Sequence, residues 1–141
     1  LLAPSLSLRF YVHLMHPMAH VVTAIPSRTP KAYRANSPAT ASAAYRALFG
    51  LLGSFHSFHT LEAINMKTLV LMHRNDEVVS FSGIKGMITN YGLDRWQMVS
   101  IENHNSRLQS DFKHMIIDPF SLGDRGWRFV THSITRFVSE L

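Results

Sequence analysis

The 141-residue chain contains no cysteine, and this absence excludes a disulfide-stapled scaffold and every metal site built from thiolates. Charged residues are scarce, at 16% of the chain, whereas hydrophobic residues make up 46%. That balance excludes an intrinsically disordered chain, because disordered segments combine low hydrophobicity with high charge. No stretch approaches the ~18 uninterrupted apolar residues that indicate a membrane-spanning helix. The composition therefore predicts one folded domain with a large apolar core.

The positive charge of the chain does not indicate a nucleic-acid partner. Fourteen Lys and Arg residues outnumber nine Asp and Glu, which gives a formal net charge of +5. The basic residues are scattered along the chain and form no run, whereas a nucleic-acid footprint needs them clustered on one face. We therefore expect no nucleic-acid partner. The sequence also shows no cofactor-binding motif, so we expect no cofactor.

Three histidines near the start of the chain share one helical face. His13, His16 and His20 lie at positions i, i+3 and i+7. This spacing suits a metal ion, but Pro17 interrupts the pattern and no carboxylate lies nearby. The alternative is a kinked or broken helix with partly exposed imidazoles, which we favour, and we expect no metal site.

The order of expected elements indicates an α/β protein. Residues 23–42 are rich in Pro, Ser, Thr and Ala and read as a long loop, longer than most connections in compact domains. Periodicity and β-propensity then predict alternating elements: a helix over 43–58, a strand over 66–72, a helix over 81–91, a strand over 96–101 and a helix over 126–141. The continuous apolar run of the first strand is typical of a parallel sheet buried on both faces.

Two residues stand where a parallel sheet collects its functional groups, just beyond the carboxyl ends of the strands. Asp76 follows the first strand by four residues, and His114 lies in the loop region after the second. A hydrogen-bonded carboxylate–imidazole pair fixes the tautomer of the ring and stabilises the imidazolium. The alternatives are a turn aspartate bonded to local backbone and a solvated surface histidine. Glu102 is a rival carboxylate, whereas Asp111 and Asp118 suit local capping.

Three segments resemble parts of the α/β-hydrolase family. The segment from Thr68 to Ser80 (TLVLMHRNDEVVS) is similar to the acid-bearing strand and turn, in which an apolar strand leads to Asp-x-Val-Val. Residues 113–118 (KHMIID) resemble the histidine loop of an esterase and lipase branch. Residues 25–55 look like the cap or lid inserted before the acid-bearing strand, and Leu2-Ala3-Pro4 resembles the end of the strand that precedes it.

The resemblance implies the C-terminal part of an α/β-hydrolase parallel sheet, with flanking helices and a helical lid insertion. Residues 1–8 would be the end of a core strand, 9–62 the lid, and 63–141 the C-terminal part of the core. Asp76 and His114 would be the catalytic acid and base of a serine hydrolase. The implied substrate is a small-molecule acyl ester or a lipid-like molecule.

The nucleophile of that family is missing from the sequence. The family places its serine in G-x-S-x-G, upstream of the acid and the histidine. No such motif occurs here, and Gly53-Ser54 lacks the flanking glycines. The chain also begins with Leu1 rather than Met, so we expect a missing N-terminal half that carries the nucleophile, with a processed mature N-terminus as the alternative. A noncatalytic module that binds an apolar ligand is the alternative function.

Overall fold

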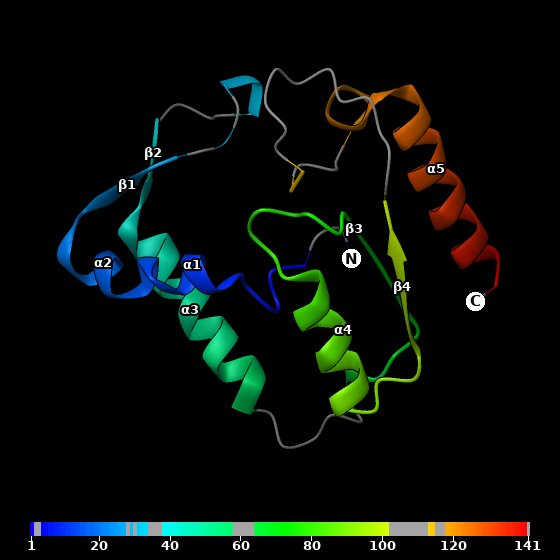
Figure 1. Ribbon diagram of the computed structural model, residues 1–141, viewed down its shortest axis with the longest axis horizontal. Helices are drawn as coiled ribbons and strands as arrows, with labels where there is room; N and C mark the ends of the chain where they lie inside the picture. The colour runs from blue at the N-terminus through cyan, green and yellow to red at the C-terminus, as the bar shows by residue number, and fades with distance from the viewer. Residues whose placement is uncertain are drawn as a thin grey trace. The chain divides into compact units, whose positions relative to one another are not determined.

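The computed structural model describes residues 1, 4–27, 29, 31–33, 38–57, 64–101, 113–114 and 118–140, without the side chains of residues 32, 56 and 57. The chain divides into two compact units (Figure 1). The sheet unit consists of residues 1–7 and 60–141, and the helical unit consists of residues 8–59. The boundaries expected from the sequence fall after residues 8 and 62. The role of the insertion as a lid stays a prediction.

The sheet unit is built around a parallel pair of strands. Strands β3 (Thr68–Met72) and β4 (Trp96–Ser100) pair in register from Thr68 opposite Trp96 to Met72 opposite Ser100. On the other edge of β3, the Leu1 amine donates to the Leu69 carbonyl at 2.6 Å, and the Leu71 amide donates to the Leu1 carbonyl at 2.9 Å. This is the hydrogen-bond pattern of a parallel neighbour, so β3 has partners on both edges.

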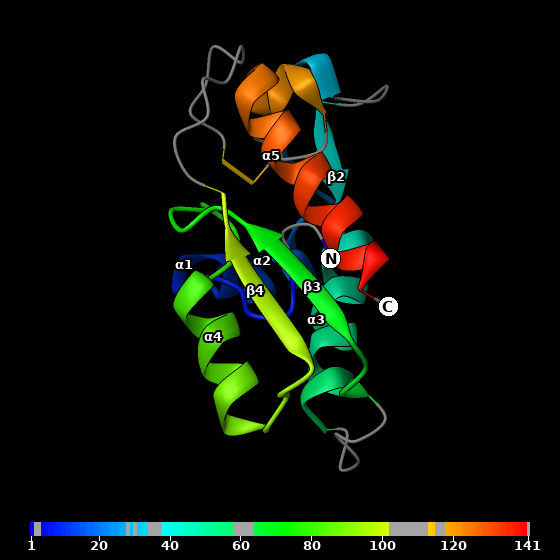
Figure 2. The ribbon, with the colours of Figure 1, turned by 90° about the vertical axis from the view of Figure 1, so that its right-hand side faces the viewer.

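Two helices cover the two faces of this sheet. Figure 1 views the strands nearly edge-on, with α4 (Phe81–Asn90) on one side and α5 (Pro119–Ser139) on the other, and Figure 2 shows the strands side by side. Ile84 from α4, with Leu122 and Val130 from α5, completes a core around the buried residues 69–72 of β3. Burial on both faces explains why β3 is a continuous apolar run rather than an alternating one.

The ends of α4 follow local sequence signals. The Ser80 hydroxyl caps the helix by accepting from the Gly83 amide at 3.0 Å. Gly92 follows the helix with a φ of 60°. That left-handed conformation favours glycine, because a Cβ there meets the neighbouring carbonyl.

The final helix differs from the expected 126–141. It begins seven residues earlier, at Pro119, because Asp118 and Ser121 form a capping box and proline suits the first turn. Gly123, with φ 68° and ψ 165°, kinks the helix. The apolar residues along this helix are only partly buried. Val130 is fully buried, but Ile134 and Val138 are exposed, and Leu141 lies outside the described residues.

Among its described residues, the helical unit contains three α-helices and a small antiparallel sheet. Helix α1 (Phe10–His13) and helix α2 (Met15–Val21) meet at Leu14. Strands β1 (Ala24–Pro26) and β2 (Ala39–Ala41) pair across a 3-10 turn at Lys31–Tyr33, and α3 (Ser42–Ser57) follows. The strands correct the expectation of an unbroken loop over 23–42. The helical hydrogen-bond pattern is interrupted at Leu14, whose dihedral angles stay helical, and not at Pro17, which is tolerated in the first turn of α2.

The observed architecture is therefore mixed α/β with a parallel strand pair, as the alternation of elements predicts. The finer expectation, that this sheet belongs to an α/β-hydrolase core, stays a prediction. No helix among the described residues is long and apolar enough to cross a membrane.

The core of the sheet unit should depend on Ile84. We predict that Ile84→Ala lowers the free energy of unfolding by about 2–5 kcal/mol, because it leaves a cavity between α4 and β3. Both tryptophans lie in the sheet unit, so their fluorescence in a urea titration reports this unit. The matched control is Lys85→Ala, the exposed next residue, which should change the value by less than about 0.5 kcal/mol. Equal effects of the two substitutions would contradict the assigned core.

Candidate functional site

The turn after β3 is held together by its own hydrogen bonds. The Asp76 amide donates to the His73 carbonyl at 3.1 Å, and the Asn75 amide donates to His73 Nδ1 at 2.9 Å. The chain therefore doubles back within four residues of the strand end. This places the Asp76 carboxylate at the carboxyl edge of the sheet, where its side chain is fully buried.

One carboxylate oxygen of Asp76 organises the turn. Oδ1 accepts from the Val78 amide at 2.7 Å and from the Val79 amide at 2.8 Å. These are the local backbone bonds typical of an aspartate in a turn. Asp76 is therefore a turn aspartate bonded to local backbone, as one alternative from the sequence proposed. These bonds use only one of its two carboxylate oxygens.

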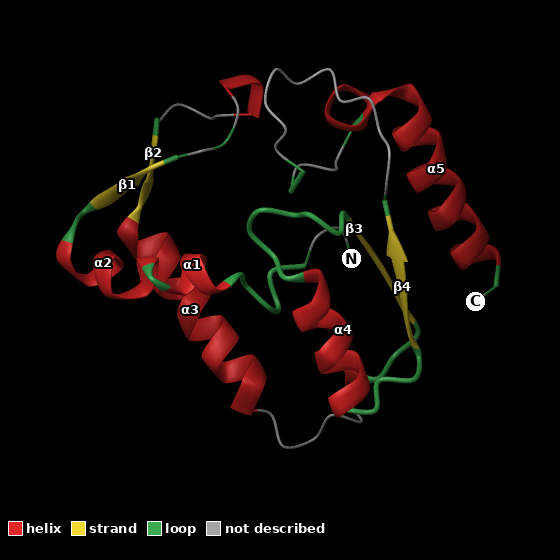
Figure 3. Cartoon of the chain, viewed as in Figure 1, coloured by secondary structure: helices red, strands yellow, loops and turns green. Residues whose placement is uncertain are grey.

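The other oxygen of Asp76 meets His114. Oδ2 lies 2.9 Å from His114 Nδ1, across 38 positions of sequence. Both residues lie in loop segments, drawn green in Figure 3. An ionised carboxylate only accepts hydrogen bonds, so we expect Nδ1 to carry the proton between the two side chains. The imidazole is 23% exposed, so the pair joins a buried anion to a base at the surface.

A second carboxylate, Glu77, holds the backbone of the same histidine. The Lys113 amide donates to Glu77 Oε1 and Oε2 at 2.8 and 2.9 Å, and the His114 amide donates to Oε2 at 3.1 Å. Consecutive acids thus fix one segment twice, Asp76 through the ring and Glu77 through the main chain. Sequence reasoning missed Glu77, because a side chain that binds backbone leaves no pattern at its partner. The adjacency of two acids after a buried strand was the available signal.

Other residues considered from the sequence have different outcomes. Glu102 and Asp111 lie outside the described residues. Asp118 caps α5, as expected, by accepting from the Ser121 amide at 2.7 Å. Within the described residues, no group of three potential ligands is arranged to hold a metal ion. His13 and His16 lie near the Phe49 ring instead, at 6.2 and 4.8 Å between ring centres, and His20 lies beside His16.

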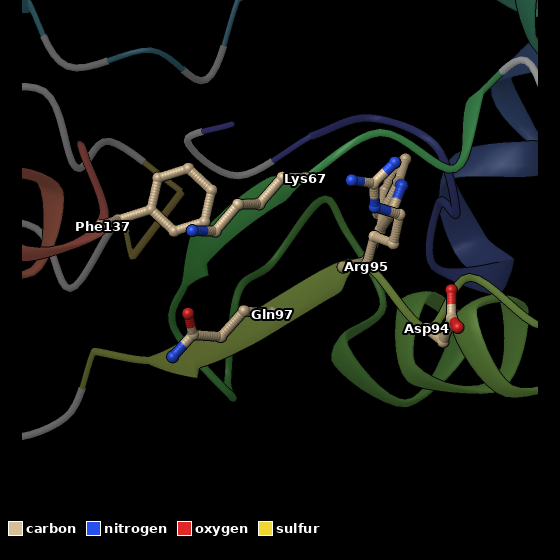
Figure 4. Close-up of a pocket in the computed structure, with 6 residues that line it drawn as sticks. Lys67, Asp94, Arg95, Gln97 and Phe137 are labelled. Atoms are coloured by element: carbon tan, nitrogen blue, oxygen red, sulfur yellow. The ribbon is translucent and has the colours of Figure 1, made fainter. Parts of the chain in front are cut away.

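A hollow of about 320 Å³ lies elsewhere in the sheet unit, near the amino ends of β3 and β4 (Figure 4). Its lining includes Lys67, Arg95 and Phe137. The Lys67 ammonium donates to the Glu140 carbonyl and sits 5.5 Å from the centre of the Phe137 ring. The wall of this hollow is thus engaged in joining α5 to β3, and it does not include the Asp76–His114 pair.

No protein-family model matches the sequence, and neither a curated protein nor a solved structure shows significant similarity to the chain. The chemistry of the site rests on its geometry alone. A neutral imidazole whose Nδ1–H is held by a buried carboxylate can accept a proton at Nε2 and carry the resulting charge. The structure brings Asp76 and His114 together, and their catalytic role stays a prediction.

Asp76 should dictate the tautomer of His114. We predict an Nδ1–H ring in the unmodified protein at about pH 9, where imidazoles are neutral, and a shift to Nε2–H in Asp76→Asn, because the new amide can donate to Nδ1. Long-range ¹H–¹⁵N correlation spectra distinguish the two forms. The exposed His132 is the internal control and should not change. An Nε2–H ring in the unmodified protein would contradict the hydrogen bond as assigned.

Glu77 should protect the backbone of the histidine segment. We predict that Glu77→Gln speeds amide exchange at Lys113 and His114 at least about tenfold, because a neutral amide offers one weaker acceptor in place of two charged ones. Hydrogen–deuterium exchange measures this directly. The matched control is Glu140→Gln, whose carboxylate pairs with Arg136 at the surface. Unchanged protection in Glu77→Gln would show that other contacts hold the segment.

Proposed function

We propose that this chain carries the acid and base of a serine hydrolase that cleaves carboxylic esters of small-molecule or lipid-like substrates. The single observation that supports the proposal is the 2.9 Å contact between Asp76 Oδ2 and His114 Nδ1 beyond the carboxyl ends of parallel strands. The resemblance of the flanking segments to an α/β-hydrolase core points to the same chemistry and to an ester substrate.

In this mechanism, His114 Nε2 removes the proton from a serine hydroxyl as its oxygen attacks the acyl carbonyl. The imidazolium then gives that proton to the leaving alcohol, and a water molecule releases the acid by the same steps. Asp76 keeps the proton on Nδ1, so that Nε2 faces the reaction as a base, and its negative charge stabilises the imidazolium. Glu77 acts as a positioning residue, because it fixes the backbone that carries the ring.

The serine must come from residues outside this sequence. The 141 residues contain no G-x-S-x-G. Ser80, the serine nearest the acid in sequence, is engaged as the cap of α4 and follows the acid rather than preceding it. The oxyanion donors of the family accompany its nucleophile and are absent with it. The proposal therefore assigns the nucleophile to a missing N-terminal half of the core.

The test compares the 141-residue chain with the same chain extended by the residues encoded directly upstream of Leu1. We predict no turnover of p-nitrophenyl esters by the shorter protein. The longer protein should hydrolyse them and react with a fluorophosphonate probe at a serine in G-x-S-x-G. His114→Ala in the longer protein should lower turnover about a thousandfold or more, because loss of a triad member has effects of that size.

The matched control for that variant is His132→Ala, an exposed histidine on α5, which should keep full turnover. Two results contradict the proposal: an upstream sequence without G-x-S-x-G, or a His114→Ala variant that keeps its activity. An extended protein that binds an apolar fluorescent ligand but hydrolyses nothing would instead support the noncatalytic binding module.

A further inference from the structure

The positive charge of the chain is concentrated in the helical unit. Residues 8–59 contain five Lys and Arg, five His and no Asp or Glu, whereas the remainder of the chain contains nine basic and nine acidic residues. The formal net charge of +5 therefore belongs to this unit. An unbroken absence of acids over 52 positions leaves the surface of the unit without an internal counter-charge and favours an anionic partner.

The same unit exposes an apolar strip along its first two helices. Leu14, which joins α1 to α2, has helical dihedral angles (φ −64°, ψ −19°), so the helical turn continues from one helix to the next. We define the outer strip as the side chains at spacings of four, four and three residues that lie on one face: Phe10, Leu14, Met18 and Val21, which are 80%, 56%, 52% and 85% exposed.

The opposite face of these helices is already occupied. Val12 and Ala19 are buried and point away from the outer strip by helical spacing. Arg46 of α3 donates to the Ala19 carbonyl at 2.6 Å, which anchors the end of α2. The imidazoles of His13 and His16 lie near the Phe49 ring of α3, between the buried face and the outer strip. A border of imidazole side chains therefore runs beside the exposed apolar face of the two helices.

We propose that the outer strip docks on an anionic lipid surface, with α1 and α2 lying in the plane of the headgroups. Exposed apolar helix faces bind membrane interfaces, and anionic lipids would add electrostatic attraction to a unit that carries five Lys and Arg and no acid. A second copy of the unit is disfavoured, because two surfaces without acids repel each other. A nucleic acid would use the charge but leave the apolar strip exposed to water.

The test is co-sedimentation of the 141-residue chain with lipid vesicles. We predict at least about tenfold stronger partitioning to phosphatidylcholine vesicles with about 30 mol% phosphatidylserine than to phosphatidylcholine alone, and weakening in about 0.5 M salt. The double variant Phe10→Gln, Val21→Gln should lose at least about tenfold in partitioning to the anionic vesicles, because two apolar side chains no longer insert. The matched control is Val138→Gln, which removes an exposed apolar residue from α5 and should bind as the unmodified chain does.

Equal partitioning to the two kinds of vesicle would overturn the proposal, as would full binding by the double variant. Binding to a duplex DNA probe without binding to vesicles, or self-association that hides the strip, would also overturn it. The lipid and salt comparisons use the unmodified chain, so they test the proposal even if the double variant loses its helices in circular dichroism. The measurement involves no catalysis, so its outcome is independent of the proposed hydrolase.

Discussion

The burial of one carboxylate is the constraint on which the sheet unit depends. Asp76 is fully shielded from water, and a buried anion is costly unless its oxygens accept hydrogen bonds. Two turn amides donate hydrogen bonds to one oxygen, and the His114 imidazole contacts the other. The requirement to satisfy both oxygens therefore links a local event, the turn after β3, to a distant one, the position of His114. The Asp76 carboxylate shapes the turn, and we expect it also to set the tautomer of the His114 ring.

This arrangement needs a rigid strand behind it. β3 has hydrogen-bonding neighbours on both edges and helices on both faces, so its carboxyl end is held firmly in the unit. Glu77, directly after the buried acid, extends that rigidity to the segment at 113–114 through three short contacts with its backbone amides. Preorganisation of this kind is what a general base requires, because catalysis gains from groups that do not have to move. The helical unit is different in character, because it holds the whole net charge and an exposed apolar strip.

Most helices and strands of the sheet unit can be predicted from the sequence, because the patterns that specify them are local. The apolar run of β3 and the helical periodicity over residues 81–91 predict their elements to within about two residues. Helical periodicity alone does not reveal the early start of α5, which is marked instead by the capping box at Asp118. The strands at Ala24–Pro26 and Ala39–Ala41 were missed because three-residue strands flanked by prolines leave no alternating pattern. Glu77 was missed because its partners are backbone amides, which every residue possesses.

A double-mutant cycle on Asp76 and His114 tests the central claim most directly. It compares the free energies of unfolding of the unmodified chain, Asp76→Asn, His114→Gln and the double variant, followed by the fluorescence of the two tryptophans of the sheet unit. A buried pair that interacts predicts a coupling free energy of about 1 kcal/mol or more between the two substitutions. Additive effects, within about 0.5 kcal/mol, would contradict it and show that the two side chains stabilise the fold independently.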